Sequence, residues 1–245
     1  MKIALIGYGK MGQEIEKLAV KRGHEIILIL NRIEDWESDG DKLSEADVAI
    51  DFSTPDSIID NIYNCFNAGV PIVTGTTGWQ DEFERVRQDC SANGKTLFYS
   101  PNFSIGVNLF FELNRYLASL MSKWTDYEIS IEETHHVHKQ DAPSGTAIVL
   151  ANDIIRTSER KEKWVNEPVE NPEEISIKSY RTENVPGNHI VKYESDEDSI
   201  SIIHSAKSRR GFAMGAIMAA EWIPGKKGYF EMKDLLTSEK INNWE

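Results

Sequence analysis

The sequence predicts an α/β protein in two parts: a doubly wound parallel sheet at the N-terminus, followed by an α+β region with a mixed sheet. In the first hundred or so residues, short apolar runs typical of buried strands alternate with segments whose apolar residues recur at helical spacing. This alternation implies parallel pairing through right-handed crossovers, and the nearly continuous apolar strands imply a sheet covered on both faces. Near residue 104 the pattern changes to helical segments and then to strand-like runs separated by turn residues.

The N-terminal pattern predicts five strands that alternate with helices, except between the second and third strands. The expected strands are the apolar runs at residues 2–6, 25–30, 47–52, 70–74 and 96–99. The expected helices lie between them, at residues 9–21, 56–67 and 80–92. Such a unit is a Rossmann-like, dinucleotide-binding pattern.

The remainder of the chain predicts a different kind of sheet. Helices are expected at residues 107–121, 146–155 and 211–220, and strands at 127–132, 175–181, 189–194 and 199–206. The charged segment at 158–174 contains Pro168 and Pro172, which predicts an exposed loop. The tail from residue 234 onward is expected to be short and to pack back on the first part.

Composition and charge exclude several classes of protein. The chain has 245 residues, of which 40% are hydrophobic, and a formal net charge of -13. Such a charge repels nucleic acid and anionic membranes, so neither is an expected partner. The apolar N-terminal run is too short for a signal peptide, and Cys65 and Cys90 form no CxxC pair. These features predict reduced thiols and a cytoplasmic protein.

The first chemical motif is Gly7-Tyr8-Gly9-Lys10-Met11-Gly12, which follows a strand and opens a helix. Glycines there let the backbone approach a pyrophosphate, which the free N–H groups of the helix end bind. A carboxylate that would bind ribose is missing at the end of the second strand, where Asn31 and Arg32 stand instead. Arg32 can face a 2'-phosphate, which favours NADPH, or it can be a solvated arginine.

Further loops follow the carboxyl ends of the predicted strands, the edge at which open parallel sheets bind ligands. One is Ser53-Thr54-Pro55, and the other two supply candidate cofactor-lining residues. Those residues are Gly75, Thr76, Thr77, Ser100, Pro101, Asn102 and Phe103.

The segment from Glu132 to Ala147 is the richest in chemistry. It holds three of the six histidines within four positions, next to Lys139, and histidine suits proton transfer near neutral pH. Ser144-Gly145-Thr146 opens the next predicted helix, where hydroxyl and N–H groups would receive a carboxylate. The alternatives are exposed histidines with a simple helix cap, and a metal site.

A metal site would use the histidines with Glu132 or Glu133 as ligands. Against it, the adjacent residues His135 and His136 point apart in an extended run. No metal is therefore expected.

The run EETHHVHKQDAPSGTA resembles the signature of the 4-hydroxy-tetrahydrodipicolinate reductases, also called dihydrodipicolinate reductases. The resemblance covers nearly the whole chain in order, through GYGKMG, AIDFSTP, GTTGW, SPNFSIGVN and HSAKSRRGFAMGA. Two departures concern the cofactor: the glycine loop is one residue shorter than usual, and Lys10 stands where arginine is common.

The resemblance implies NADPH- or NADH-dependent reduction of a cyclic dicarboxylate in lysine and diaminopimelate biosynthesis. It implies a dinucleotide domain at residues 1–103 completed by 209–245, and a substrate-binding and tetramerisation domain at 104–208 of a homotetramer. It makes His135 the acid/base residue and Lys139 a proton donor. It places His136, Ser144, Gly145 and Thr146 at the substrate, and Arg209 near the cofactor.

Three other functions stay open at this point. A non-catalytic dinucleotide sensor would bind cofactor without substrate-dependent oxidation. Another dehydrogenase, such as an aspartate dehydrogenase, would not need DAPSGTA beside HHVHK. A metal hydrolase would contain a bound ion.

Overall fold

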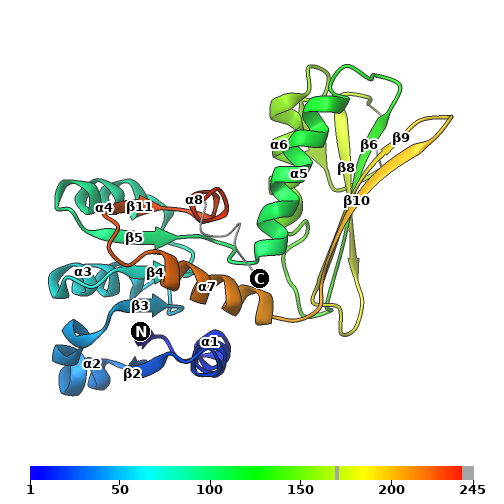
Figure 1. Cartoon of the computed structure of the whole chain (residues 1–245). Coiled ribbons are helices and arrows are strands. Elements are labelled where there is room, and N and C mark those ends of the chain that lie inside the picture. The colour runs from blue at the N-terminus through cyan, green and yellow to red at the C-terminus, as the bar shows by residue number, and fades with distance from the viewer. Residues whose placement is uncertain (169–170, 239–245) are drawn as a thin grey trace. The chain divides into compact units, whose positions relative to one another are not determined.

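The computed structural model describes residues 1–168 and 171–238 and divides the chain into two compact units. The first consists of Met1–Ile105 with Arg209–Glu245, and the second is Gly106–Ser208. Figure 1 labels the elements of both units. Each unit has its own sheet and its own hydrophobic core.

The first unit contains a parallel sheet of six strands in the order β11-β5-β4-β3-β1-β2. The strands are β1 Lys2–Ile6, β2 Glu25–Leu30, β3 Val48–Asp51, β4 Ile72–Thr74, β5 Thr96–Tyr99 and β11 Gly228–Phe230. Strand order reverses beside β1, so the ends of β1 and β3 form the switch point at which such sheets bind ligands. The predicted doubly wound parallel sheet is confirmed.

Helices cover both faces of this sheet (Figure 1). They are α1 Lys10–Lys21, α2 Ile33–Asp39, the short 3-10 helix η1 Gly40–Glu45, α3 Ile58–Ala68, α4 Gln80–Ala92, α7 Arg210–Trp222 and α8 Met232–Leu236. Alternate residues of β1 enter different cores: Ile3 and Leu5 pack with α1, α7 and α8, whereas Ala4 and Ile6 pack with α3 and α4. This alternation explains why the strand is apolar at nearly every position.

The second unit contains a mixed sheet of five strands in the order β10-β9-β6-β8-β7. The strands are β6 Glu128–His135, β7 Lys163–Val165, β8 Glu174–Arg181, β9 Gly187–Glu194 and β10 Ser199–Ala206. β9 pairs antiparallel with β6 and β10, whereas β6, β8 and β7 are parallel. Apolar residues of α5 (Ile105–Met121) and α6 (Gly145–Thr157) cover one face. The predicted mixed sheet is confirmed.

Three segments contain elements that the sequence did not predict. The predicted loop at 158–174 contains β7, and two of its residues, 169 and 170, lie outside the described part. The stretch after Arg32 forms α2 and η1. Residues 228–236 form β11 and α8; α8 packs on the core of the first unit, as expected of the tail, and residues 239–245 lie outside the described part. β11 pairs in parallel with β5 and so extends the first sheet.

Both cysteines are free and buried, as the sequence predicts. In the described part of the chain, no helix has the length and apolar character needed to cross a membrane.

Candidate active site

One face of β6 changes from apolar to ionisable as the strand ends. Ile129 and Ile131 point into the core of the second unit, and Glu133 and His135 occupy the next two positions on the same face. Glu133 is fully buried and His135 is 8% exposed. The strand therefore delivers a carboxylate and an imidazole to the border of the core.

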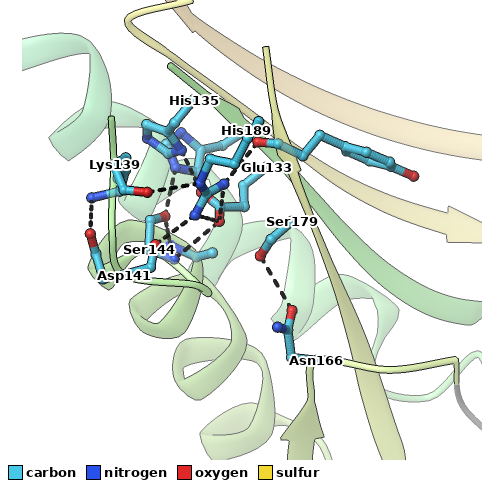
Figure 2. Close-up of polar contacts among 11 residues, drawn as sticks. Glu133, His135, Lys139, Asp141, Ser144, Asn166, Ser179 and His189 are labelled. Carbon is cyan, nitrogen blue, oxygen red and sulfur yellow. Dashed lines mark hydrogen bonds and ion pairs between the residues drawn. The ribbon is translucent and has the colours of Figure 1, made fainter. Parts of the chain in front are cut away.

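The two oxygens of Glu133 have different partners (Figure 2). Oε2 lies 2.5 Å from His135 Nδ1, an ion-pair contact without the alignment of a straight hydrogen bond. Oε1 accepts from both terminal nitrogens of Arg181, at 3.2 Å each, and from the backbone N–H of Ser144 at 3.2 Å. Arg181 comes from β8, whose His135↔Arg181 register brings it beside the end of β6.

Lys139 lies in the turn after β6, where its N–H donates to the carbonyl of His136 at 3.0 Å. Its ammonium pairs with Asp141 Oδ1 at 2.7 Å, and this contact contributes to a lowered pKa of the Asp141 carboxyl. Arg181 holds the same turn, because it donates to the carbonyls of Lys139 and Asp141. An ammonium has three N–H donors, so the pair leaves Lys139 able to bind a second anion.

Ser144 caps the N-terminus of α6. Its Oγ accepts from the N–H of Ala147 at 3.2 Å and lies 3.1 Å from Nε2 of His189 on β9. The N–H groups of Gly145 and Thr146 precede the first intrahelical bond and carry the positive end of the helix dipole. A Cβ placed on Gly145 would meet nothing within 4 Å, so a ligand can approach this helix end closely.

The two remaining histidines of the segment stand apart from the cluster of Glu133, His135 and His189. The ring of His136 is half-buried and lies 6.2 Å from the ring of the exposed His138, between centroids. The sequence prediction that His135 and His136 diverge is consistent with this arrangement. His138 has no assigned role.

The charge states of the cluster follow from its contacts. Burial opposes ionisation of Glu133, but the contacts from His135 and Ser144 outweigh it and lower the pKa of the carboxyl to about 2. Burial, with His135 nearby, lowers the pKa of His189 to about 3. At neutral pH the cluster therefore holds an ionised Glu133 and a neutral His189.

Glu133, His135 and His189 each offer one ligand atom, and these atoms lie within 4.8 Å of one another. The residue types fit Zn²⁺, but two arguments favour a hydrogen-bonded cluster. Ligands at about 2.0–2.2 Å from one ion lie further apart than the 2.5 Å between Glu133 Oε2 and His135 Nδ1. In addition, Arg181 already balances the charge of the carboxylate.

The glycine motif of the first unit forms the turn between β1 and α1. Gly7 has φ +81°, and a Cβ on it would lie 2.3 Å from the carbonyl oxygen of Phe52. A Cβ on Gly12 would lie 2.4 Å from the carbonyl oxygen of Gly7, so these two glycines let strand and helix approach. A Cβ on Gly9, the N-cap of α1, would meet nothing within 4 Å, which leaves room for a phosphate.

A cavity of about 310 Å³ lies beside this turn, at the end of β2. Gly7, Asn31, Arg32 and Ser53 contribute to its lining. Asn31 Oδ1 accepts from the N–H of Tyr8 at 2.8 Å and so holds the glycine turn. The cavity is large enough for the adenosine part of a dinucleotide, and Arg32 lies where such a group would carry its ribose.

The carboxylate of Asp35 contacts the backbone at the end of β2. Asp35 accepts from the N–H groups of Asn31 and Arg32, at 2.8 Å each, and these hydrogen bonds lower the pKa of its carboxyl. The carboxylate therefore caps α2.

Asp51, at the end of β3, is a fully buried carboxylate between two of the predicted cofactor loops. Its oxygens accept from the hydroxyls of Ser53, Thr74 and Thr76 and from the side-chain amide of Asn61, at 2.6–3.2 Å. The N–H of Ser53 donates both to Asp51 and to Thr76 Oγ1. Burial raises the pKa of the Asp51 carboxyl against the effect of these donors.

The other predicted cofactor residues lie in the first unit with mixed exposure. Phe103 is 1% exposed and its ring packs on Phe52 and Phe98, so its side chain belongs to the core. A Cβ on Gly75 would lie 2.2 Å from the ring of Phe52. Tyr8, Met11, Thr76 and Ser100 are partly or fully buried, whereas Lys10, Thr77, Pro101 and Arg209 are exposed.

The site segments and both sheets match known proteins over nearly the whole chain. Residues 1–103 match the family described as "Dihydrodipicolinate reductase, N-terminus", and residues 106–236 match "Dihydrodipicolinate reductase, C-terminus". A 4-hydroxy-tetrahydrodipicolinate reductase of Christiangramia forsetii is 47% identical over 97% of this chain and 98% of its own length. One of Archaeoglobus fulgidus is 35% identical over 96% of this chain and 100% of its own.

The chain belongs to the dihydrodipicolinate reductase family. Proteins of this family are NAD(P)H-dependent oxidoreductases of lysine and diaminopimelate biosynthesis. A solved structure of a dihydrodipicolinate reductase from Paenisporosarcina sp. TG-14, with dipicolinate bound, shares the fold. It covers 94% of this chain and 97% of its own, with a TM-score of 0.73 and 22% identity.

Within this dihydrodipicolinate reductase fold, three polar residues of the two sites, Asp51, Arg181 and His189, were not singled out from the sequence, and Glu133 was named only as a possible metal ligand. Asp51 and Glu133 end otherwise apolar strand faces, and that period-two signal is visible in the sequence. Arg181 and His189 reach the site only through strand pairing, 46 or more positions along the chain from His135. No local sequence pattern predicts that these two residues belong to the site.

Proposed function

We propose that the chain reduces 4-hydroxy-tetrahydrodipicolinate to tetrahydrodipicolinate with NADPH or NADH, in the cytoplasm. Each turnover consumes one hydride and one proton and releases one water. Family membership supports the reaction, and the observation that carries the site is the end of β6 beside the N-terminus of α6. There an imidazole, an ammonium and a helix N-terminus gather in a protein whose net charge is -13.

The second unit supplies the groups that a doubly anionic ring needs. We assign its carboxylates to the N–H groups of Gly145 and Thr146, with His136 and Ser144 beside them, because a helix N-terminus binds anions. The open space over Gly145 supports this assignment.

Proton transfer is assigned to His135 and Lys139. His135 faces Glu133 through Nδ1, so Nε2 is the nitrogen left to exchange a proton with substrate. Lys139, as an ammonium, balances carboxylate charge and can donate the second proton.

We assign the cofactor to the first unit. The reduced nicotinamide supplies the hydride when bound. Three features support this assignment: the Gly7–Gly12 turn with its open N-cap, the cavity at Arg32, and the loops that Asp51 ties together. Arg32 favours NADPH, because a guanidinium pairs well with a 2'-phosphate.

We also propose a homotetramer built on the sheet of the second unit. The face of that sheet away from α5 and α6 carries Ile203, which is 62% exposed, and Tyr180, which is 46% exposed. Exposed apolar residues on a sheet face are typical of an assembly surface. Sedimentation equilibrium tests the assembly state: a single species of four chains is expected, and a monomer at assay concentration contradicts the proposal.

The test of function is oxidation of NADPH and, separately, NADH in the presence of synthase-generated substrate. We expect wild-type turnover, and His135→Gln and Lys139→Met to lower kcat by about 10²- to 10⁴-fold each. Lys123→Met removes an exposed positive charge from the same unit and serves as the matched control. No substrate-dependent oxidation by the wild type rejects the function, and near-normal turnover in both site variants rejects the roles.

A further inference from the structure

Glu133 is a fully buried carboxylate for which the proposed reaction has no direct use. It stands two positions before His135 on β6, so the two side chains leave the strand on the same face. A buried charge is costly unless it is paired, and this one is paired twice. The question is what the double pairing achieves.

The two carboxylate oxygens of Glu133 contact different partners. Oε1 is fixed by the guanidinium of Arg181 and by the N–H of Ser144, which belong to β8 and to the start of α6. Oε2 is thereby turned toward His135 Nδ1 at 2.5 Å. The carboxylate is therefore held by β8 and the start of α6 through Oε1 and contacts the imidazole through Oε2.

We propose that Glu133 is a positioning residue that fixes the tautomer and orientation of His135, an inference that rests on the proposed role of His135. A neutral imidazole carries its proton on either nitrogen, and a carboxylate beside Nδ1 favours the proton there. Nε2 is then the nitrogen with a free lone pair, available to the substrate. Without the carboxylate, both tautomers are populated and the ring can turn.

The far side of the His135 ring is also constrained. A Cβ placed on Gly187, at the start of β9, would lie 3.0 Å from His135 Nε2. The ring of His189 stands edge-on to it, with centroids 5.0 Å apart. Glu133 and His189 therefore lie against the ring, and the missing side chain of Gly187 leaves space beside Nε2.

The two neighbouring glutamates offer a matched pair of variants. Glu133→Gln keeps the size of the side chain and removes its charge. Glu132→Gln makes the same change one position earlier on β6, where the side chain is half-exposed and lies on the opposite face.

The experiment combines kinetics with ¹⁵N NMR of the histidine rings, and His135→Gln identifies the signals of His135. In Glu133→Gln we expect kcat to fall about 10²-fold with the KM for NADPH unchanged, because acid–base catalysis is impaired and the cofactor unit is untouched. The His135 signals should shift from the Nδ1–H form toward a mixture of tautomers. Glu132→Gln should stay within about twofold of wild type in both measurements.

A purely structural role for Glu133 predicts a less stable protein whose His135 tautomer is unchanged. That outcome, or kcat within about threefold of wild type, overturns the proposal. If Glu133→Gln fails to fold, Glu133→Asp keeps the charge opposite Arg181 but withdraws it from His135, and the same shift is expected. The NMR readout does not require turnover, so it separates failure of this inference from failure of the proposed function.

Discussion

Asp51 and Glu133 are both fully buried carboxylates at the ends of strands, yet their surroundings drive them in opposite directions. Asp51 has neutral donors: three hydroxyls, one side-chain amide and one backbone N–H. Burial prevails, and the pKa of its carboxyl is raised. Burial also acts on Glu133, but His135 and Ser144 lower the pKa of its carboxyl to about 2.

The difference shows that the partners, together with the depth of burial, decide the charge state of a buried carboxyl. It also separates two uses of such a group. Asp51 connects the loop at Ser53 with the loop at Thr76 and so shapes the predicted cofactor edge. Glu133 contacts two ionisable side chains, Arg181 and His135, and of these only His135 is assigned to proton transfer.

The largest expected loss of stability follows from replacing each carboxylate side chain by the corresponding amide. Glu133→Gln leaves Arg181 without its counter-charge and should cost about 3 kcal/mol of unfolding free energy. Asp51→Asn should cost about 1 kcal/mol, because hydroxyls can rotate and the Asn61 amide can turn to satisfy the new group. Urea unfolding near neutral pH measures both, and a larger loss for Asp51→Asn would break the comparison.

The pH dependence of stability should carry opposite signs at the two sites. The pKa of Glu133 falls from 4.5 to about 2, so its contribution is complete above pH 4.5 and is lost as pH falls toward 2. The pKa of Asp51 is raised above 3.8, so its contribution is present below that value and is lost as pH rises through the folded pKa.

Unfolding free energies across the acid range test these signs. Relative to wild type, Glu133→Gln should flatten the loss of stability between pH 4.5 and 2. Asp51→Asn should remove the loss of stability that the wild type shows as pH rises through the folded pKa of Asp51. Parallel curves for both variants and the wild type contradict the assignment.

Variants in the two regions should also differ in which ligand they bind less tightly. Asp51→Asn loosens the loops at Ser53 and Thr76, and we expect the Kd for NADPH to rise about tenfold while binding of pyridine-2,6-dicarboxylate to the second unit is unchanged. Thr146→Val keeps the N–H at the start of α6 but removes the hydroxyl predicted to receive a carboxylate, and it should weaken dicarboxylate binding alone. Isothermal titration with each ligand measures both, and equal losses for both ligands would show general unfolding.

The smallest expected effect is that of metal removal. Because Glu133 Oε2 and His135 Nδ1 are in direct contact, the cluster with His189 should bind no stoichiometric ion. Elemental analysis should find less than about 0.1 transition-metal ion per chain, and dialysis against a chelator should leave kcat unchanged. One zinc ion per chain, with activity lost on chelation, would contradict this prediction and show that Glu133, His135 and His189 form a metal centre.

The periodic patterns of the sequence were sufficient for both sheets and for the long helices. They failed where an element lacks an apolar stripe of its own. α2 has only Ile33 and Trp36 among acidic and polar residues, and β7 is three residues long within a charged segment. β11 is equally short and is defined by its pairing with β5. Strand pairing, rather than local propensity, forms β7 and β11, and the contacts of Asp35 cap the start of α2.

The residues of the candidate site also differ in whether the sequence predicts them. The segment from His135 to Thr146 is contiguous, so its chemistry is visible in the sequence. Arg181 and His189 come from β8 and β9, and the mixed pairing order that brings them to β6 does not follow from their own residues. A contiguous motif is predictable, whereas the residues that hold it in place require the fold.

A crystal structure of the protein with NADPH and pyridine-2,6-dicarboxylate tests the central claim most directly. The account predicts one carboxylate of the ligand on the N–H groups of Gly145 and Thr146, with His135 Nε2 and Lys139 Nζ facing the ring. A dicarboxylate bound elsewhere, with the start of α6 and His135 turned away from it, contradicts the account.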